Sequence, residues 1–260
     1  MALTNKITAI ADAIRRKNGE TTKYTMPEMV TAIDALPTGG GDDALFNMDA
    51  SGNVTGKATT INGFMYNTTL ASCKSILSAI GRGSVSAISA SFPKCSTLGS
   101  AAFCSASSLA TVDFPVCTSI GKYAFYQCGK LNTINFPACT TINTGAFYQG
   151  GALTTVNFPA CTNIGVQAFY NSTGITTVDL AKNCTISSSA FYSCSKLTIF
   201  ILRDTSAVST LAASDAFNNT PIKSGTGYIY VPDDLVDSYK AATNWSVYAA
   251  QIKPLSELPA

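Results

Sequence analysis

The sequence predicts an α/β repeat solenoid, in which units of equal length stack along one axis. Three observations lead to this fold class: Phe-Pro recurs every 22 residues, Ala-Phe recurs with the same period, and two apolar columns keep the same phase. Self-similarity at such a period is typical of stacked repeats. The columns are Phe92, Phe114, Phe136 and Phe158; Phe103, Phe125, Phe147, Phe169 and Phe191; Leu109, Leu131, Leu153, Ile175 and Leu197; and Val112, Ile134, Val156, Val178 and Phe200.

Within one unit, apolar residues alternate as in a short strand with one buried face. The unit that begins at Leu131 has Ile134 and Phe136 at alternate positions, and Cys139 and Ile142 follow. This is the spacing of a leucine-rich repeat. It predicts a parallel β-sheet on the concave side of the solenoid and short helices or 3₁₀ turns on the convex side.

The chain divides into four expected segments. Apolar residues at helical spacing, such as Ile7, Ile10 and Ile14, predict an N-terminal helical hairpin. Gly39 to Gly41 and the two aspartates that follow indicate a linker. A terminal repeat needs a cap, because it would otherwise expose strand edges and apolar surface. The segments are 1–37, the hairpin; 38–60, a linker or entry segment; 61–232, a solenoid of about eight units; and 233–260, a C-terminal cap.

Composition excludes several classes of function. The chain has 260 residues and no histidine, which removes histidine-based acid–base and nucleophile systems and the commonest metal ligand. The formal net charge is +2 and the basic residues are scattered, so we expect no nucleic-acid partner. No apolar run suits membrane insertion, and the N-terminus lacks the order of a secretory signal. We therefore expect a virion-associated or cytoplasmic protein, with a cell-surface location as the alternative.

The cysteines follow the repeat rather than a metal or disulfide framework. A column of parallel side chains neither converges on a metal nor offers disulfide geometry, so we expect buried reduced thiols and no metal or cofactor. The turn position after the strand takes Cys or Asn, and its occupants are Cys73, Cys95, Cys117, Cys139, Cys161 and Asn183.

Two outward-facing sets of residues are candidate ligand-binding surfaces. One lies on the strands, where a threonine column accompanies Asp113, Asn135, Asn157 and Asp179. It is either a solvated sheet surface or a polar platform for a protein or glycan ligand. The other follows the Ala-Phe motif and either covers the phenylalanine column or forms an aromatic binding strip. Its members are Tyr126, Tyr148, Tyr170 and Tyr192.

The segment from Phe114 to Cys128, which reads FPxCTxIGxxAFYxC, resembles the BspA-type leucine-rich repeats. The resemblance covers roughly residues 65 to 231. It implies a bacterial protein of the kind that adheres to host matrix or to other cells. The helical opening, LTNKITAIADAIRRKNG, resembles a short module of phage and prophage tail-associated proteins.

We expect a non-enzymatic binding or structural protein, because no catalytic residue stands out. The first hypothesis is a phage- or prophage-encoded tail protein, in which the hairpin contacts other virion proteins. The alternative is a surface adhesin that binds host matrix or cell-surface ligands. An enzyme would require a deep pocket lined by carboxylates or by low-pKa thiols.

Overall fold

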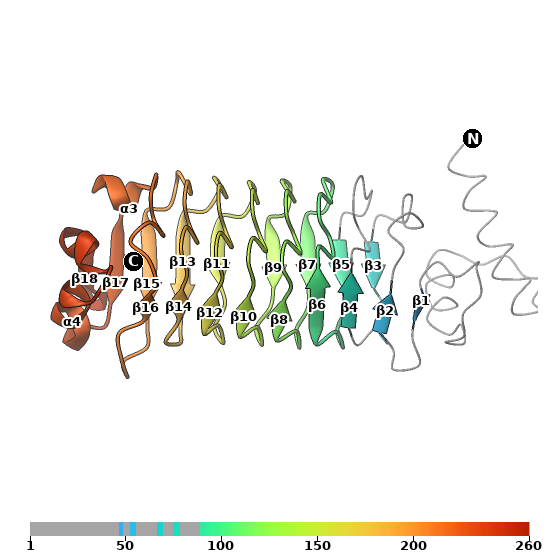
Figure 1. The fold of residues 1–260 in the computed structure, drawn as a ribbon, viewed down its shortest axis with the longest axis horizontal. Helices are drawn as coiled ribbons and strands as arrows, with labels where there is room; N and C mark the ends of the chain where they lie inside the picture. Colours follow the sequence, from blue (N-terminus) through green and yellow to red (C-terminus); the bar gives the residue numbers. More distant parts are fainter. Residues whose placement is uncertain (1–46, 49–52, 56–66, 70–74, 79–88, 260) are drawn as a thin grey trace, which may run out of the picture.

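The computed structural model describes residues 47–48, 53–55, 67–69, 75–78 and 89–259. They form a rod of stacked coils, with short strands crossing it and helical turns at the C-terminal end (Figure 1). The predicted leucine-rich-repeat solenoid is confirmed. The expected hairpin over 1–37 and Cys73 lie outside the described residues.

One side of each coil contributes a short strand, which between residues 111 and 179 lies in a Thr-x-Asn or Thr-x-Asp segment. These strands pair in parallel, and in the regular coils the partners are 22 residues apart, as Thr155 and Thr177 are. The strands are β3 (Asn67–Thr69), β5 (Ser89–Ser91), β7 (Thr111–Asp113), β9 (Thr133–Asn135), β11 (Thr155–Asn157), β13 (Thr177–Leu180), β15 (Ile199–Leu202), β17 (Tyr228–Val231) and β18 (Ile252–Pro254).

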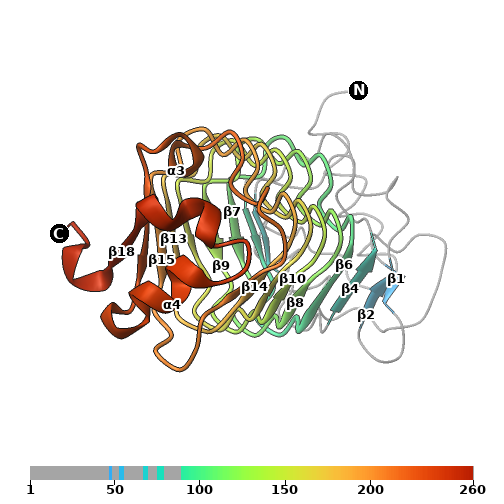
Figure 2. The same cartoon turned by 60° about the vertical axis from the view of Figure 1, so that its left-hand side comes forward.

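A second sheet runs along the return side of the coils, separated from the first in Figure 2. All of its strands pair in parallel except β1 with β2, which are antiparallel and lie in the range expected to be a linker. The strands are β1 (Asn47–Met48), β2 (Asn53–Thr55), β4 (Ser75–Ser78), β6 (Thr97–Ser100), β8 (Ser119–Ile120), β10 (Thr141–Ile142), β12 (Asn163–Ile164), β14 (Thr185–Ile186) and β16 (Thr210–Leu211).

The third side of each coil is a run of tight turns at the Ala-Phe motif. The amides of Ala124 and Tyr126 donate to carbonyls three residues back in the same coil. The intervening amide of Phe125 donates to the carbonyl of Ala146 in the next coil, at 2.7 Å. Alternate amides therefore close the turns and join the coils, so that almost every backbone donor here is paired.

The returns are tight turns with hydrogen bonds three residues back, within the expectation of short helices or 3₁₀ turns, and left-handed residues explain why they do not extend into helices. Residues with φ between 53° and 61° recur four positions apart, and each interrupts a right-handed helix. The second sheet on the return side was not expected from the sequence. The left-handed residues of the regular coils are Ala101, Tyr123, Gly145, Gln167 and Ser189 in one column, and Ser105, Gln127, Gln149, Asn171 and Ser193 in the other.

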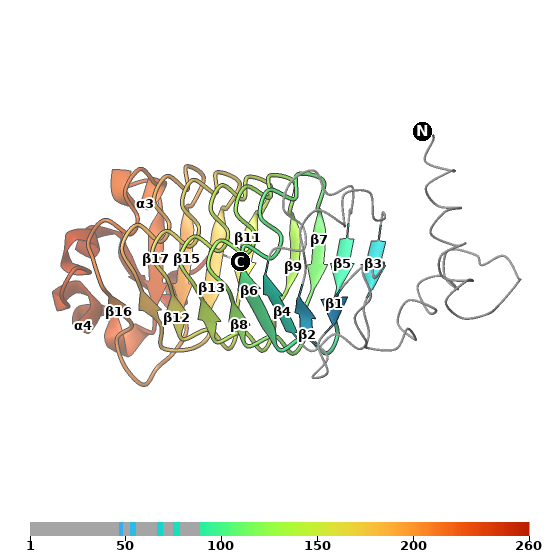
Figure 3. The same cartoon turned by 45° about the vertical axis from the view of Figure 1, so that its right-hand side comes forward.

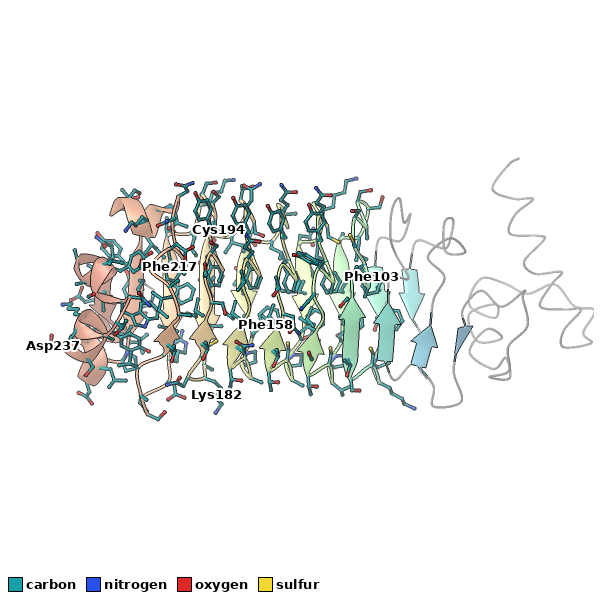
Figure 4. All side chains as sticks on the ribbon, viewed as in Figure 1. Phe103, Phe158, Lys182, Cys194, Phe217 and Asp237 are labelled. Carbon is teal, nitrogen blue, oxygen red and sulfur yellow. The ribbon has the colours of Figure 1, made fainter. Side chains whose placement is uncertain are left out.

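The core consists of two phenylalanine ladders inside the coils. In the ladder from Phe103 to Phe191, successive ring centroids lie 5.1 to 5.4 Å apart and the rings are nearly parallel. Rings of the second ladder meet the first at about 6 Å, tilted or edge-on. Figure 4 shows Phe103, Phe158 and Phe217 inside the rod at successive levels.

The strand ladder of the first side is interrupted once, between β9 and β11. The four-stranded sheet ends at β9 and the five-stranded sheet begins at β11, although β10 pairs with β12 on the return side. The rings of Phe136 and Phe158 are 6.1 Å apart, against 5.2 Å for Phe114 and Phe136. Ile134 in β9 is only partly buried, whereas Val112 is fully buried. The coils are spread apart along this one side.

A close approach between two coils lies beside the interruption, at Gly174. A Cβ on this residue would lie 2.3 Å from the carbonyl oxygen of Gly151 and 2.6 Å from that of Leu153. The equivalent residues of the neighbouring coils, Ala152 and Lys196, carry side chains. The missing side chain lets the backbone of residues 151–153, just before β11, lie close to Gly174 in the next coil.

The cysteine column is buried, as predicted, but its last member, Cys184, lies one residue later than the 22-residue period predicts. Cys95, Cys117, Cys139 and Cys161 each donate to the carbonyl two residues ahead, at 3.3 to 3.4 Å. The expected substitution of Asn183 inside the turn is wrong, because Cys184 is buried there. Asn183 reaches outward instead and donates to the carbonyl of Ala207 at 3.1 Å. That carbonyl is available because the next coil is longer: Thr185 pairs with Thr210.

The C-terminal segment covers the last coil and also extends the sheet. Tyr239, Trp245 and Tyr248 are buried, and the indole nitrogen of Trp245 donates to the carbonyl of Ser209 at 2.6 Å. β18 adds a final parallel strand beside β17. The helical elements are α3 (Pro221–Ser224), η1 (Asp233–Leu235), α4 (Val236–Ala241), η2 (Ser246–Gln251) and η3 (Leu255–Glu257).

Candidate functional site

The strand candidates lie in one row on the sheet, and we call this surface, with its threonine column, the threonine face. The strands β7 to β13 place its residues side by side, as seen in Figure 3. It is not one continuous platform, because the interruption between β9 and β11 divides it in the middle. Its residues are Thr111, Asp113, Thr133, Asn135, Thr155, Asn157, Thr177 and Asp179.

The two carboxylates of the threonine face are engaged by neighbouring side chains. Asp113 accepts from the Ser91 hydroxyl at 3.1 Å and from the Asn135 amide nitrogen at 2.6 Å. Asp179 accepts two close hydrogen bonds from Arg203, both at 2.8 Å. Charge on this face is therefore neutralised or held by hydrogen bonds, and neither aspartate is poised as a free acid or base.

The middle of the threonine face is its most accessible part. Thr133, Asn135, Thr155 and Asn157 are exposed, whereas the threonines and aspartates of β7 and β13 are half-buried. Within the described part of the chain, the amide of Asn157 has no side-chain partner, and Asn135 keeps its oxygen free. The exposed amides therefore lie on the two strands that flank the interruption.

The tyrosine candidates form a stacked ladder over the turns. Ring centroids of Tyr126, Tyr148, Tyr170 and Tyr192 are separated by 4.8 to 5.1 Å, and the rings lie within 26° of parallel. The stacked faces contact one another, so the edges and hydroxyls reach solvent. Burial by the adjacent rings raises the pKa of Tyr148. Because the hydroxyl stays protonated, it can donate as well as accept hydrogen bonds.

Sequence reasoning missed Tyr123, which has no counterpart in the tyrosine column. It lies one turn before Tyr126, with the two rings at 86° and their centroids 5.9 Å apart. Tyr123 is 41% exposed. The signal in the sequence was a departure from the repeat: this left-handed position has tyrosine in one coil and Gly145 in the next. We call Tyr123 together with the ladder the tyrosine ridge.

The buried thiols of the described coils do not form a reactive centre. Burial raises the pKa of Cys117 to about 11 and the pKa values of Cys128 and Cys194 to about 12. A hydrogen bond from Cys184 lowers the pKa of Cys161, but the Cys161 side chain is fully buried. The eight cysteines that the structure describes are free. A nucleophilic thiol would need both a low pKa and access to solvent.

The described ranges contain neither a cluster of metal ligands nor a helix that could span a membrane. There, no group of three or more histidine, cysteine or acidic residues is arranged to hold a metal ion. Among the helices described, none has the length and apolar character needed to cross a bilayer. The surfaces that remain for function are the threonine face and the tyrosine ridge.

Three solved structures resemble this chain. The pneumococcal vaccine antigen PcpA is 16% identical with a TM-score of 0.53, over 82% of this chain and 47% of that one. The leucine-rich repeat protein of T. pallidum is 21% identical with a TM-score of 0.51, over 56% and 72%. A leucine-rich cell surface protein of Faecalibacterium prausnitzii is 21% identical with a TM-score of 0.41, over 59% and 52%. At these identities the likeness establishes the fold alone.

A family model gives the membership directly. The BspA type leucine rich repeat region matches residues 74–198 and 118–231, and so covers more than half of the chain. A comparison with curated proteins found no match. The matched range contains the strands from β4 to β17, the ridge turns and both phenylalanine ladders described above. The chain therefore belongs to the BspA-type leucine-rich repeat family.

Proposed function

We propose that this chain is a non-enzymatic recognition protein that binds a protein ligand at a cell surface or in extracellular matrix. The observation that carries the proposal is the exposed centre of the threonine face. There Asn135 and Asn157 present amide groups with free hydrogen-bonding capacity on the two edge strands that flank the interruption. Amides can both donate and accept, which suits the mixed polar groups of a protein surface.

The rigidity of the scaffold supports a binding role. The residues that carry the exposed amides sit on strands above fully buried side chains such as Val156 and Phe158. A surface that is already ordered loses little conformational entropy when it binds a partner. Solenoids commonly use their extended repeat surface in this way.

A surface context is favoured over the phage-tail hypothesis. The solved structures named above include a bacterial cell surface protein and a pneumococcal antigen, and none of the three is named as a phage protein. The phage hypothesis depended on the helical opening at 1–37, which lies outside the described residues. An adhesin-like role agrees better with the family of the repeats.

The proposal is tested by binding the intact chain to a panel of immobilised matrix proteins. We expect Asn135→Ala combined with Asn157→Ala to weaken binding at least about tenfold, since a central interface residue contributes about 1.4 kcal/mol or more. The matched control is Asn163→Ala combined with Thr185→Ala, which removes similar groups from the opposite sheet. The proposal is contradicted if neither the wild type nor the control variant binds any of the matrix proteins. It is also contradicted if the two double variants bind equally well.

A further inference from the structure

The tyrosine ridge departs from its own repeat at one place. Tyr123 and Gly145 occupy equivalent left-handed positions of neighbouring coils, with φ of 55° and 61°. A Cβ on Gly145 would lie 2.4 Å from the Tyr123 ring. The ring therefore lies across the backbone of Gly145, and the missing side chain makes room for it.

Tyr123 differs from the other tyrosines of the ridge in what it exposes. The ladder tyrosines use their ring faces to stack on one another, with Tyr148 and Tyr170 only 4.8 Å apart. Tyr123 has one face on Gly145 and its edge region against Tyr126, and 41% of the residue is exposed. It is therefore a fixed aromatic ring whose outer face is open to solvent.

The backbone at Tyr123 takes the left-handed conformation that the repeat imposes at this position of every regular coil. This conformation is unfavourable for a residue with a bulky side chain, and glycine occupies the same position at Gly145 without that strain. Tyr123 is the one aromatic residue in this column, whose other members are Ala101, Gly145, Gln167 and Ser189. Tyr123 contributes nothing to the buried phenylalanine ladders that would otherwise explain it.

Polar groups of complementary kinds surround the open ring. Gln127 donates its amide nitrogen to the amide oxygen of Gln149 at 2.9 Å, which leaves one acceptor on Gln127 and one donor on Gln149. Lys122 and Lys130 are exposed nearby, and the segments 121–131 and 143–153 contain no acidic residue. The site therefore offers an aromatic face, donors and acceptors on a shallow surface.

We propose that Tyr123, Tyr126, Gln127 and Gln149 form a binding subsite for a glycan chain. The C–H face of a sugar ring would stack on the open face of Tyr123, because aromatic faces carry partial negative charge. Sugar hydroxyls, which donate and accept, match the free groups of the two glutamines. The following sugars would run along the ridge beside the hydroxyls of Tyr148 and Tyr170.

A polysaccharide fits this surface better than an apolar peptide does. An apolar side chain needs a pocket that removes it from water, whereas the Tyr123 ring lies on the outside of the rod. The tyrosine spacing of about 5 Å is comparable to the length of one pyranose unit, so successive sugars can meet successive coils. Contacts repeated along one chain would add, which makes affinity increase with ligand length.

The experiment is a calorimetric titration of the full chain with β-linked glucose oligomers and with uronic-acid-containing oligomers of matched length. We expect binding that strengthens with oligomer length and weakens about tenfold in Tyr123→Ala. Tyr123→Phe keeps the ring and should stay close to the wild type, and so should Thr185→Ala on the opposite sheet. Preferential binding of the uronic acids would indicate that Lys122 and Lys130 take part.

Thermal melting of each variant separates loss of the site from loss of the fold. The proposal is overturned if no oligomer binds, if a folded Tyr123→Ala variant binds like the wild type, or if Tyr123→Phe loses binding as completely as Tyr123→Ala. It is independent of the threonine face: the double variant of Asn135 and Asn157 should keep glycan binding, and Tyr123→Ala should keep binding to matrix protein.

Discussion

The threonine face and the tyrosine ridge are built by the same 22-residue period, yet they differ in continuity. On the ridge, turn amides join each regular coil to the next, as Phe125 joins Ala146 and Phe147 joins Ala168, both at 2.7 Å. On the threonine face the ladder stops at β9 and resumes at β11. At the interruption, neighbouring coils are therefore farther apart on the side of the threonine face than on the side of the ridge.

The difference shows which contacts hold the stack together. The ridge turns lie directly over the ladder from Phe103 to Phe191, whose rings remain evenly spaced past the interruption. The second ladder, under the threonine face, is the one that widens. The sheet can thus lose a row of hydrogen bonds where its strands are only three residues long, while the buried ring ladder stays intact.

The largest effect is expected when the ridge ladder itself is broken. Phe147→Ala removes a fully buried ring between Phe125 and Phe169, and should lower the free energy of unfolding by about 3–5 kcal/mol. Tyr148→Ala is the control, since it removes the adjacent half-exposed ring and should cost much less. Urea denaturation measures both, and equal losses would show that the outer and inner ladders stabilise the stack alike.

A smaller effect is expected at the glycines where coils approach closely. A Cβ on Gly121 would lie 2.4 Å from backbone atoms of Gly99, so Gly121→Ala should destabilise the protein by about 1–3 kcal/mol. At Gly151 the nearest atom would be 3.8 Å away, and the same substitution should change stability by no more than about 0.5 kcal/mol. Thermal melting compares the pair, and a reversed order would contradict the coil spacing described here.

The period made the fold predictable, because columns such as Leu109 to Leu197 can only be buried by stacking. It predicted the buried thiols for the same reason. Features that depend on one coil differing from the next were not predictable. The interruption lies beside the close approach at Gly174, the burial of Cys184 goes with a longer following coil, and the position of Tyr123 depends on Gly145.

In the candidate site, too, the repeated features were predictable and the contacts particular to one pair of coils were not. Repetition placed Asn135 and Asn157 on one face and the tyrosines in one ladder, since residues 22 apart must stack. It could not tell that Asp113 and Asp179 are engaged by Ser91, Asn135 and Arg203, because these contacts involve side-chain reach between coils. The accessible groups were therefore recognisable only with the coils in place.

Hydrogen exchange at three equivalent amides tests the contrast between the two sides most directly. The amides of Asn132 and Thr176 donate to carbonyls of the preceding coil at 2.9 and 2.8 Å, whereas the equivalent amide of Thr154, beside the interruption, has no such bond. Thr154 should therefore exchange at least about tenfold faster than the other two. Equal protection of all three amides would show that the ladder is continuous and would contradict the interrupted threonine face.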